Sequence, residues 1–428
     1  MRDYYCTSVS KAGYAWHPAE FLFQSGVLAE HFDVQIIDAI AQELNPHEAA
    51  RLIREPVDLL VGLVGAACPD EDLDFIRKIP ARLKVVSGEV VLPQPAKWLA
   101  NHKGIDAAMS DFSIARLLDL AEGAEEAPGL AIRSKRGIST PTSVNTSFID
   151  IPTPCHELFN MRAYRMPLQK HRPYAELLTD FGCPHRCSFC NSGSLPYRRR
   201  RADGIDRELD LIQRLGLRQI FLKDMSFGAH SEHAVMIADL LAARDFDWHC
   251  YARIDNLTDV LIERMARAGC RLVQIGVEHV NEKILRRAGK RYTPGRIRDV
   301  FQAIRRAGMD AGAHLVLGLP GETPETLKEL ERFIDTFDDA IYLSINLYAP
   351  RMGSPLAGIG EVGDGPHDST NGSDFGALPK AVLVRARNAM YRGFYLRPAR
   401  IMRLARKMHP DDMTRSLTGF LKRVMLKR

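Results

Sequence analysis

Short apolar segments alternate with amphipathic segments between residues 176 and 356. Each apolar segment has the length of a buried strand and ends on polar or glycine residues, whereas the intervening segments carry apolar residues at helical spacing. Parallel strands need crossovers of this length, so the pattern predicts a partial (βα)6 barrel of TIM type. The expected strands are residues 175–181, 218–227, 248–255, 271–279, 311–322 and 340–350.

The segment after the first expected strand concentrates three of the eight cysteines into eight residues. Cys183, Cys187 and Cys190 form a C-x3-C-x2-C loop, placed where α/β proteins bind their ligands. A structural zinc site usually has four ligands, whereas a [4Fe–4S] cluster held by three cysteines leaves one iron free. No second Cys or His pair lies at a suitable distance, and a zinc loop completed by His185 or by a distant residue is the alternative.

The rest of the composition predicts a cytoplasmic protein of two or three domains. The 428 residues are 46% hydrophobic and 26% charged, as in ordinary globular proteins. The sequence contains no apolar run long enough for a membrane span, and its N-terminus resembles no signal peptide. In the cytoplasm, eight cysteines indicate metal or redox chemistry more than a disulfide framework.

The cysteine loop and its flanks, GCPHRCSFCN, resemble the signature of radical S-adenosylmethionine (SAM) enzymes. The flanks are similar to the branch with a cobalamin (B12)-binding domain, which includes the anaerobic magnesium-protoporphyrin oxidative cyclase group. The resemblance implies that Cys183, Cys187 and Cys190 hold a [4Fe–4S] cluster. It implies further that the free iron binds SAM, that Phe189 packs near the adenine, and that an electron donor such as flavodoxin or ferredoxin reduces the cluster.

Other segments that resemble this family follow the loop in order, one after each expected strand. A glycine-rich turn between a strand and a helix is common in α/β proteins, so the order of these segments carries more weight than any single one. His249, His279 and His314 are interpreted as structural histidines. The residues that the resemblance assigns to cofactor binding are Phe189, Asp224, Arg253, Glu278, Gly318, Pro320, Gly321 and Glu322.

Residues 1–125 are predicted to form a smaller, flavodoxin-like parallel sheet with ligands at its strand ends. Its strands are expected at residues 33–40, 57–66, 83–92 and 104–112. The order resembles a cobalamin-binding domain, with His17, Asp38 and the segment Ser87-Gly88-Glu89 at the expected positions. No D-x-H-x-x-G motif assigns a histidine to cobalt, so the alternative is a domain that only shapes the substrate cavity.

Three further segments are predicted from composition. Residues 126–175, with scattered prolines, are expected to be a linker, and residues 357–379, rich in Gly, Ser and Asp, a flexible loop. Residues 380–428 hold 14 basic residues but two acidic ones, and predict a basic helical extension. This extension could cap the barrel or contact an anionic membrane surface; nucleic-acid binding is disfavoured, because no recognised nucleic-acid module accompanies the charge.

These observations predict a radical SAM enzyme that cleaves SAM and functionalises an unactivated carbon of a hydrophobic, lipid-like or natural-product-type small molecule. C-methylation is expected if cobalamin binds, and radical oxidation, cyclisation or rearrangement if it does not. The alternative of a different class is a non-catalytic, zinc-stapled protein that associates with nucleic acid or a membrane. The sequence identifies neither the substrate nor a catalytic residue that quenches the product radical.

Overall fold

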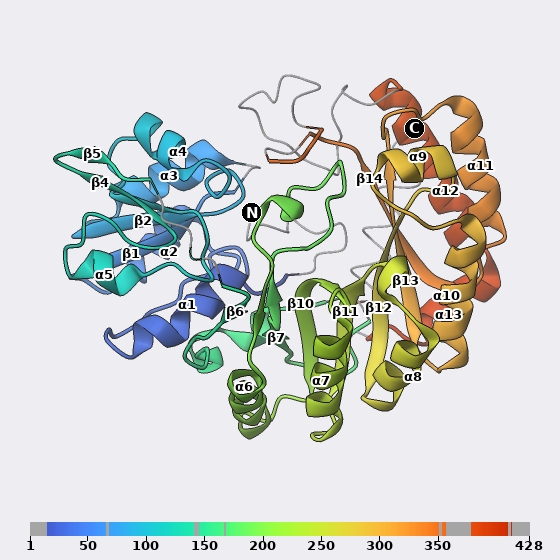
Figure 1. Cartoon of the computed structure of the whole chain (residues 1–428), viewed down its shortest axis with the longest axis horizontal. Helices are drawn as coiled ribbons and strands as arrows, with labels where there is room; N and C mark the ends of the chain where they lie inside the picture. The colour runs from blue at the N-terminus through green and yellow to red at the C-terminus, as the bar shows by residue number, and fades with distance from the viewer. Residues whose placement is uncertain are drawn as a thin grey trace.

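A computed structural model of the chain describes residues 15–65, 68–140, 144, 146–166, 168–350, 353–356, 378–409 and 412. A smaller sheet with its helices and a larger parallel sheet lie on opposite sides of the molecule (Figure 1). The segment with the cysteine loop runs between the two sheets. The flexible loop predicted at residues 357–379 lies almost entirely outside the described residues, as does most of the chain after residue 409. No helix in the described ranges is long and apolar enough to cross a membrane.

The larger sheet has six parallel strands in the order β14-β13-β12-β11-β10-β7. This order confirms the predicted α/β architecture, with each strand next to its neighbour in sequence. Residues buried between strands and helices, such as Ile220, Trp248 and Val273, form the core of this half. The strands are β7 Ala175–Leu177, β10 Gln219–Phe227, β11 Asp247–Ala252, β12 Cys270–Glu278, β13 Asp310–Leu317 and β14 Ala340–Leu347.

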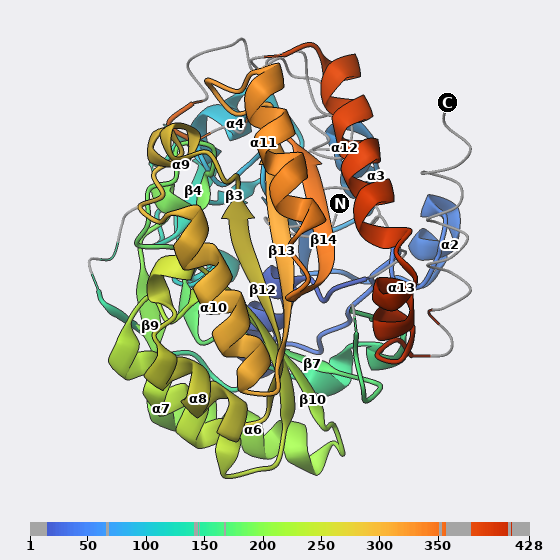
Figure 2. The same ribbon diagram turned by 90° about the vertical axis from the view of Figure 1, so that its right-hand side faces the viewer.

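A layer of helices covers the outer face of the larger sheet (Figure 2). Several begin at a threonine whose side chain accepts a hydrogen bond from the first turn, as Thr258, Thr293 and Thr323 do. These caps fix where each helix starts after its strand and so shape the edge that carries the cysteine loop. The helices are α6 Ala202–Arg214, α7 Ser231–Ala242, α8 Asp259–Arg267, α9 Glu282–Arg287, α10 Pro294–Arg306 and α11 Pro324–Asp335.

The smaller sheet has the order β1-β2-β3-β4-β5 and is mixed rather than fully parallel. Residues 33–40, expected to be a strand, form none. Leu130–Ser134, expected in the linker, instead forms β4 and pairs antiparallel with β3, because its apolar residues are buried there. The other strands are β1 Leu59–Leu63, β2 Leu83–Ser87, β3 Ala107–Met109 and β5 Gly137–Ile138, and the helices are α1 Ala19–Ala29, α2 Pro46–Arg51, α3 Pro69–Lys78, α4 Pro95–Asn101 and α5 Leu117–Ala121.

A three-stranded ribbon of β6 Phe148–Ile149, β9 Arg198–Arg200 and β8 Asp180–Phe181 joins the two halves. The buried guanidinium of Arg198 pairs with Asp111 of the smaller half. Beside this pair, the rings of Phe112 and Phe181 meet edge to face, with centroids 4.9 Å apart. Because β8 leads directly into the cysteine loop, the smaller half is anchored next to the loop.

Helix α12, Lys380–Tyr395, packs against β14, the edge strand of the larger sheet. The hydroxyl of Tyr395 accepts from the backbone N–H of Leu343 at 2.9 Å and donates to its carbonyl at 3.0 Å. The hydroxyl of Tyr391 does the same for Ile345, at 2.9 and 3.3 Å. Two tyrosines therefore satisfy edge groups of β14 that would otherwise lack a strand partner.

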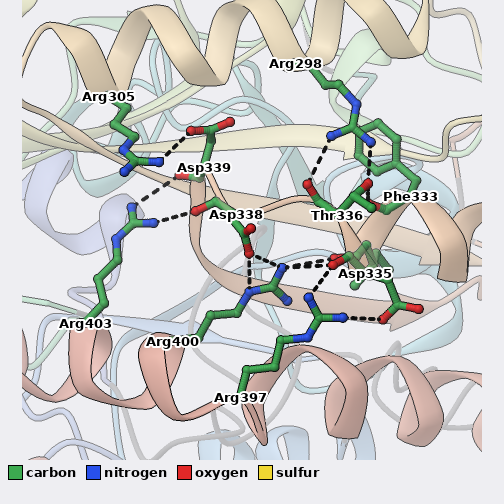
Figure 3. A network of polar contacts seen from close by, with 11 residues as sticks. Arg298, Arg305, Phe333, Asp335, Thr336, Asp338, Asp339, Arg397, Arg400 and Arg403 are labelled. Carbon is green, nitrogen blue, oxygen red and sulfur yellow. Dashed lines mark hydrogen bonds and ion pairs between the residues drawn. The ribbon is translucent and has the colours of Figure 1, made fainter.

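Arg397, directly before helix α13, and the arginines of α13, Pro398–Ala405, lie on the turn after α11 (Figure 3). Arg397 pairs with Asp335 at 3.1 Å, and Arg400 with Asp338 at 2.5 Å. Arg403 donates to the carbonyl of Asp338 at 2.6 Å. These described basic residues of the C-terminal extension thus bind the barrel itself, while membrane contact by residues 380–428 stays a prediction.

Replacing Tyr391 and Tyr395 with phenylalanine should loosen this edge. Each substitution removes the hydroxyl that one N–H and one C=O of β14 bind, at a cost of about 1–3 kcal/mol. We expect a lower free energy of unfolding in urea and faster amide exchange at Leu343 and Ile345. Tyr348→Phe is the matched control, because the Tyr348 hydroxyl has no hydrogen bond among the described residues; equal effects in both variants would contradict the edge role.

Candidate functional site

The cysteine loop is a compact turn between β8 and β9 at the carboxyl edge of the larger sheet. Gly182 has φ +75°, and a Cβ there would lie 2.4 Å from the carbonyl oxygen of Pro196. A Cβ on Gly193 would lie 2.5 Å from the carbonyl oxygen of His185. Both glycines let the backbone close on itself, so the loop is preformed by its own sequence.

The three thiols share this turn but differ in exposure. Cys187 is buried, while Cys183 and Cys190 are partly exposed. The backbone N–H of Cys190 donates to the carbonyl of Cys187 at 3.1 Å, and that of Ser192 to the Cys190 Sγ at 3.4 Å. Burial raises the pKa of Cys183 to about 12 and also raises that of Cys187, so both are neutral thiols unless a cation stabilises the thiolate.

The described residues contain no group of three or more His, Cys, Asp and Glu side chains that could hold a single metal ion. The zinc loop that the sequence offered as the alternative is not among such groups in this part of the chain, and it stays an alternative. Iron–sulfur clusters are bound by cysteine thiolates, each on its own iron, and need no convergence on one point. The three-cysteine donor set on a preformed turn fits such a cluster.

Arg253, at the end of β11, contacts the loop directly. Its Nη1 donates to the Cys187 Sγ at 2.8 Å, and its Nη2 donates to Asp255 at 2.5 Å. The Nε of Arg253 is buried without a partner in the described chain. A charge-assisted donor to this sulfur stabilises its thiolate form, and the cofactor role of Arg253 stays a prediction.

Glu278, at the end of β12, forms a buried ion pair with Lys290. This ion pair was not predicted from the sequence. The Nζ of Lys290 lies 3.0 Å from Oε1 of Glu278. Glu278 has φ +59°, a backbone conformation that is strained for any residue other than glycine. Strain of this kind tends to occur at functional sites. Lys290 sits in a loop of exposed basic residues, and only its position between the buried Leu285 and Tyr292 could have indicated that it points inward.

The turn after β13 brings together the G-x-P-G-E residues. Gly318 has φ +90°, and its N–H donates to Oε2 of Glu322 at 2.5 Å. The other oxygen of Glu322 lies 3.3 Å from Nε2 of His279, and both side chains are fully buried. Gly321, with φ +92°, lies against the Arg287 side chain, and a Cβ on Gly321 would be 2.0 Å from Nη1 of Arg287. Pro320 lies between Gly318 and Gly321 in the same turn.

Phe189 connects the cysteine loop to this turn. It is partly buried and packs in the apolar cluster that contains Leu319, Val316 and Tyr348. The cluster places the loop against the carboxyl end of β13. The structure thus brings Phe189, Arg253, Glu278 and the turn at residues 318–322 to the same edge of the sheet as the three cysteines.

Asp224 lies beneath the loop rather than on the loop surface. Its carboxylate accepts hydrogen bonds from the backbone N–H of Thr179 at 2.6 Å, from that of Asp180 at 3.0 Å and from the Thr179 hydroxyl at 2.5 Å. Burial raises the pKa of Asp224 to about 6. Burial, and then the charge of Asp224, raise the pKa of Asp180 well above its usual value.

The smaller half and the segment after β14 also reach the loop. A Cβ on Gly353 would lie 3.3 Å from Ser194 Oγ, 3.7 Å from Pro93 Cβ and 3.8 Å from Asn191 Cβ. The backbone N–H of Leu356 donates to the carbonyl of Ser188 at 3.0 Å. Three parts of the chain that are far apart in sequence therefore meet at the cysteine loop.

Comparisons with known proteins agree with this geometry. The family model of the radical SAM superfamily matches residues 179–334. The chain is 24% identical over 358 residues to an uncharacterized methyltransferase of Pyrococcus horikoshii, covering 79% of this chain and 77% of that protein. It is 30% identical over 213 residues to a ribosomal protein uS12 methylthiotransferase of Geotalea uraniireducens, but there spans 45% of this chain and 46% of the relative.

Two solved structures share the fold over most of the chain. The radical SAM methyltransferase TsrM of Kitasatospora setae, solved with cobalamin and a [4Fe–4S] cluster, has a TM-score of 0.63 at 19% identity, covering 93% of this chain and 89% of that chain. The cobalamin-dependent SAM radical enzyme OxsB has a TM-score of 0.67 at 16% identity, covering 94% and 69%. At these identities the likeness concerns the fold.

Breaking the Lys290–Glu278 pair should be costly. Lys290→Met leaves the Glu278 carboxylate buried and unpaired, which we expect to lower the free energy of unfolding by about 3–5 kcal/mol. The double variant Lys290→Met with Glu278→Gln should recover most of this loss in urea denaturation. Arg286→Met, which breaks the exposed Arg286–Glu282 pair, is the control and should cost less than about 1 kcal/mol; a similar loss in both single variants would contradict the buried pairing.

The two buried aspartates predict a pH dependence of stability. Because their pKa values are raised in the folded state, the folded protein binds more protons than the unfolded chain, and stability should fall as pH rises from about 4 through about 6. Asp180→Asn removes a buried ionisable carboxyl, whose raised pKa destabilises the fold above pH 4, and should raise the free energy of unfolding at pH 7 by about 1–3 kcal/mol. Urea denaturation across this range checks it, with exposed Asp299→Asn as the control; an identical slope in wild type and Asp180→Asn would contradict the coupling.

Proposed function

We propose that the protein uses cobalamin to methylate an unactivated carbon. The premise is that residues 179–334 form a radical SAM domain and that the protein is a radical SAM enzyme. The substrate would be a small molecule of hydrophobic or natural-product type. The observation that carries the proposal is the meeting of the smaller half with the cysteine loop at Pro93, Asn191 and Gly353. That arrangement would place a cofactor of the smaller half beside the cluster.

Cys183, Cys187 and Cys190 would hold the [4Fe–4S] cluster. When bound, the cluster supplies the electron that cleaves SAM reductively, which is the chemistry that radical SAM enzymes share. The protein's own contribution is position and shielding. The buried Cys187 and the guanidinium of Arg253 would hold one side of the cluster, and the apolar packing of Phe189 would exclude water from another.

We assign SAM binding to Phe189, Arg253, Glu278 and the turn at residues 318–322, which share one edge with the cysteines. Asp224 would act indirectly. Its oxygens already accept hydrogen bonds from Thr179 and Asp180, so it would position the chain that enters the loop. Glu322 likewise would hold the turn through Gly318 and His279.

The smaller half offers features that suit cobalamin. Ser87, at the carboxyl end of β2, is fully buried, and its hydroxyl has no hydrogen bond among the described residues. A Cβ on the next residue, Gly88, would lie 2.2 Å from the carbonyl oxygen of Val64, so the backbone there admits no side chain. Ligands of such sheets bind at the carboxyl ends of their strands, and we propose that cobalamin contacts this edge.

His17 is occupied by packing and would not serve as the lower ligand of cobalt. Its ring stacks on Tyr164 with centroids 3.8 Å apart, and its backbone N–H donates to Glu176 at 3.0 Å. Asp38 accepts from the Tyr164 hydroxyl at 3.0 Å. Cobalamin would therefore be held without a histidine from this segment.

Radical oxidation, cyclisation or rearrangement is the alternative if cobalamin does not bind. Methyl transfer is favoured, because the relative that covers most of the chain is described as a methyltransferase and TsrM as a radical SAM methyltransferase. The methylthiotransferases match less than half of their own length. The residues before the cysteine loop also contain no second cysteine triad.

Anaerobic purification and reconstitution test the proposal. We expect about four irons and four sulfides per chain, cobalamin in stoichiometric amount, and formation of 5′-deoxyadenosine or transfer of a labelled methyl group from SAM. Cys187→Ala should lose the iron, because the buried ligand is gone. Cys155→Ala, a partly exposed cysteine outside the loop, is the matched control and should retain it.

The outcomes separate the alternatives. Stoichiometric zinc without SAM cleavage would overturn the enzymatic proposal. A full cluster with SAM cleavage but no cobalamin would overturn the methylation proposal and favour oxidation, cyclisation or rearrangement. Loss of iron in Cys155→Ala to the same degree as in Cys187→Ala would contradict the assigned ligands.

A further inference from the structure

We propose that helix α13 is a docking surface for a membrane whose lipids carry a net negative charge. The surface is the side of α13 that faces away from the barrel, at Ile401, Met402 and Arg406, and we call it the outer face. The proposal goes beyond the proposed reaction and does not depend on it.

Helix α13 is amphipathic, but its charged side rather than its apolar side packs on the protein. The side chain of Arg400 is buried against Asp338, and Arg403 donates to the carbonyl of Asp338. Ile401 and Met402, in contrast, are 49% and 54% exposed. A surface helix of a globular protein normally turns its apolar side toward the core. The inverted orientation of α13 therefore leaves two large apolar side chains in contact with water.

Ion pairs on both sides of the helix fix this orientation. Arg397, directly before α13, pairs with Asp335 at 3.1 Å, and Lys407, shortly after it, pairs with Asp310 at 3.0 Å. Figure 3 shows the arginines at α13 pointing together toward the turn after α11. The helix cannot rotate its apolar side inward without breaking these contacts, so the outer face is a built feature of the fold.

A cation lies at the edge of the outer face. The backbone N–H of Arg406 donates to the carbonyl of Met402 at 3.1 Å, and residues four apart on a helical turn lie on the same side. Arg406 is exposed, and its guanidinium has no ion pair or hydrogen bond with another described residue. Arg306 on α10 is exposed too, but that helix buries all of its large apolar side chains. The combination of exposed apolar residues with a cation suits the boundary between lipid headgroups and acyl chains.

The sequence that follows α13 has the same chemistry. Residues 413–428, which lie outside the described part of the chain, contain five basic and no acidic residues. Apolar residues recur at positions 417, 420, 421, 424 and 425, a spacing typical of one side of an amphipathic helix. A basic sequence with this pattern, shortly after the outer face, favours an anionic lipid surface as the partner.

Other occupants fit the outer face less well. A stable homodimer buries about 800 Å² on each partner, whereas the outer face is one side of a helix of eight residues. A nucleic acid would match the charge but would leave the apolar side chains without a partner. Binding to a bilayer adds the burial of apolar side chains to the attraction between cations and lipid headgroups, and so uses both features.

Vesicle sedimentation with the full chain tests the outer face. The test variant is Ile401→Gln with Met402→Gln, which keeps good helix formers and removes the apolar surface. The control variant is Leu215→Gln with Val260→Gln, which makes the same change at exposed apolar residues at the end of α6 and in α8. Because all four side chains are exposed, both variants should unfold in urea as wild type does.

The vesicles consist of phosphatidylcholine alone or mixed with phosphatidylglycerol. Wild type should bind the mixed vesicles at least about tenfold more tightly than the neutral ones, and less tightly as salt rises. The test variant should bind the mixed vesicles about tenfold or more weakly than wild type, and the control variant like wild type. Arg406→Gln should weaken binding about fivefold, and Arg306→Gln should have little effect.

Three results would overturn the proposal. Equal binding by the test and control variants would show that the outer face is not the docking surface. Equal binding of wild type to mixed and neutral vesicles would contradict the assigned lipid chemistry. A dimer in analytical ultracentrifugation that the test variant abolishes, with no binding of wild type to vesicles, would make a second copy of the chain the occupant.

Phe420→Gln with Leu421→Gln separates the outer face from the end of the chain. Weaker or unchanged binding to the mixed vesicles supports the membrane as the occupant. Stronger binding would mean that the end of the chain covers the outer face, and would contradict the proposal. None of these measurements needs the cluster, so a failed reconstitution would count against the proposed function alone.

Discussion

The buried carboxylate of Asp224 fixes the point at which the chain leaves the barrel and enters the cysteine loop. It binds two consecutive backbone N–H groups and one hydroxyl at Thr179 and Asp180, between β7 and β8. These hydrogen bonds turn the chain out of the larger sheet and into the ribbon that carries the loop. The position of all three cysteines depends on that turn, and the raised pKa of Asp224 reflects the burial that it requires.

The loop is then held from several sides by contacts of different kinds. Arg253 bonds to the Cys187 sulfur, Gly289 packs on the Cys187 backbone, and Phe189 packs into the apolar cluster at the end of β13. Pro93 of the smaller half also lies beside the loop, next to Gly353. Such redundancy suits a site whose occupant is large, charged and sensitive to water, since each contact fixes geometry before the cofactor arrives.

The C-terminal extension shows how the same charge can serve structure. Its sequence suggested a cap or a membrane-binding helix, and Arg397, Arg400 and Arg403 bind aspartates and carbonyls at the turn after α11. Its tyrosines satisfy the edge of β14.

The sequence by itself determined the parallel strands, their helices and the cysteine loop, because periodicity and C-x3-C-x2-C spacing are local properties. Only the tertiary structure decided that Leu130–Ser134 joins the smaller sheet, that Asp224 supports the loop from beneath, and that Lys290 turns inward to Glu278. Each of these depends on a partner distant in sequence, in a strand pairing, a buried hydrogen bond or an ion pair. Local pattern shows which residues can be buried, but the fold alone decides what they meet there.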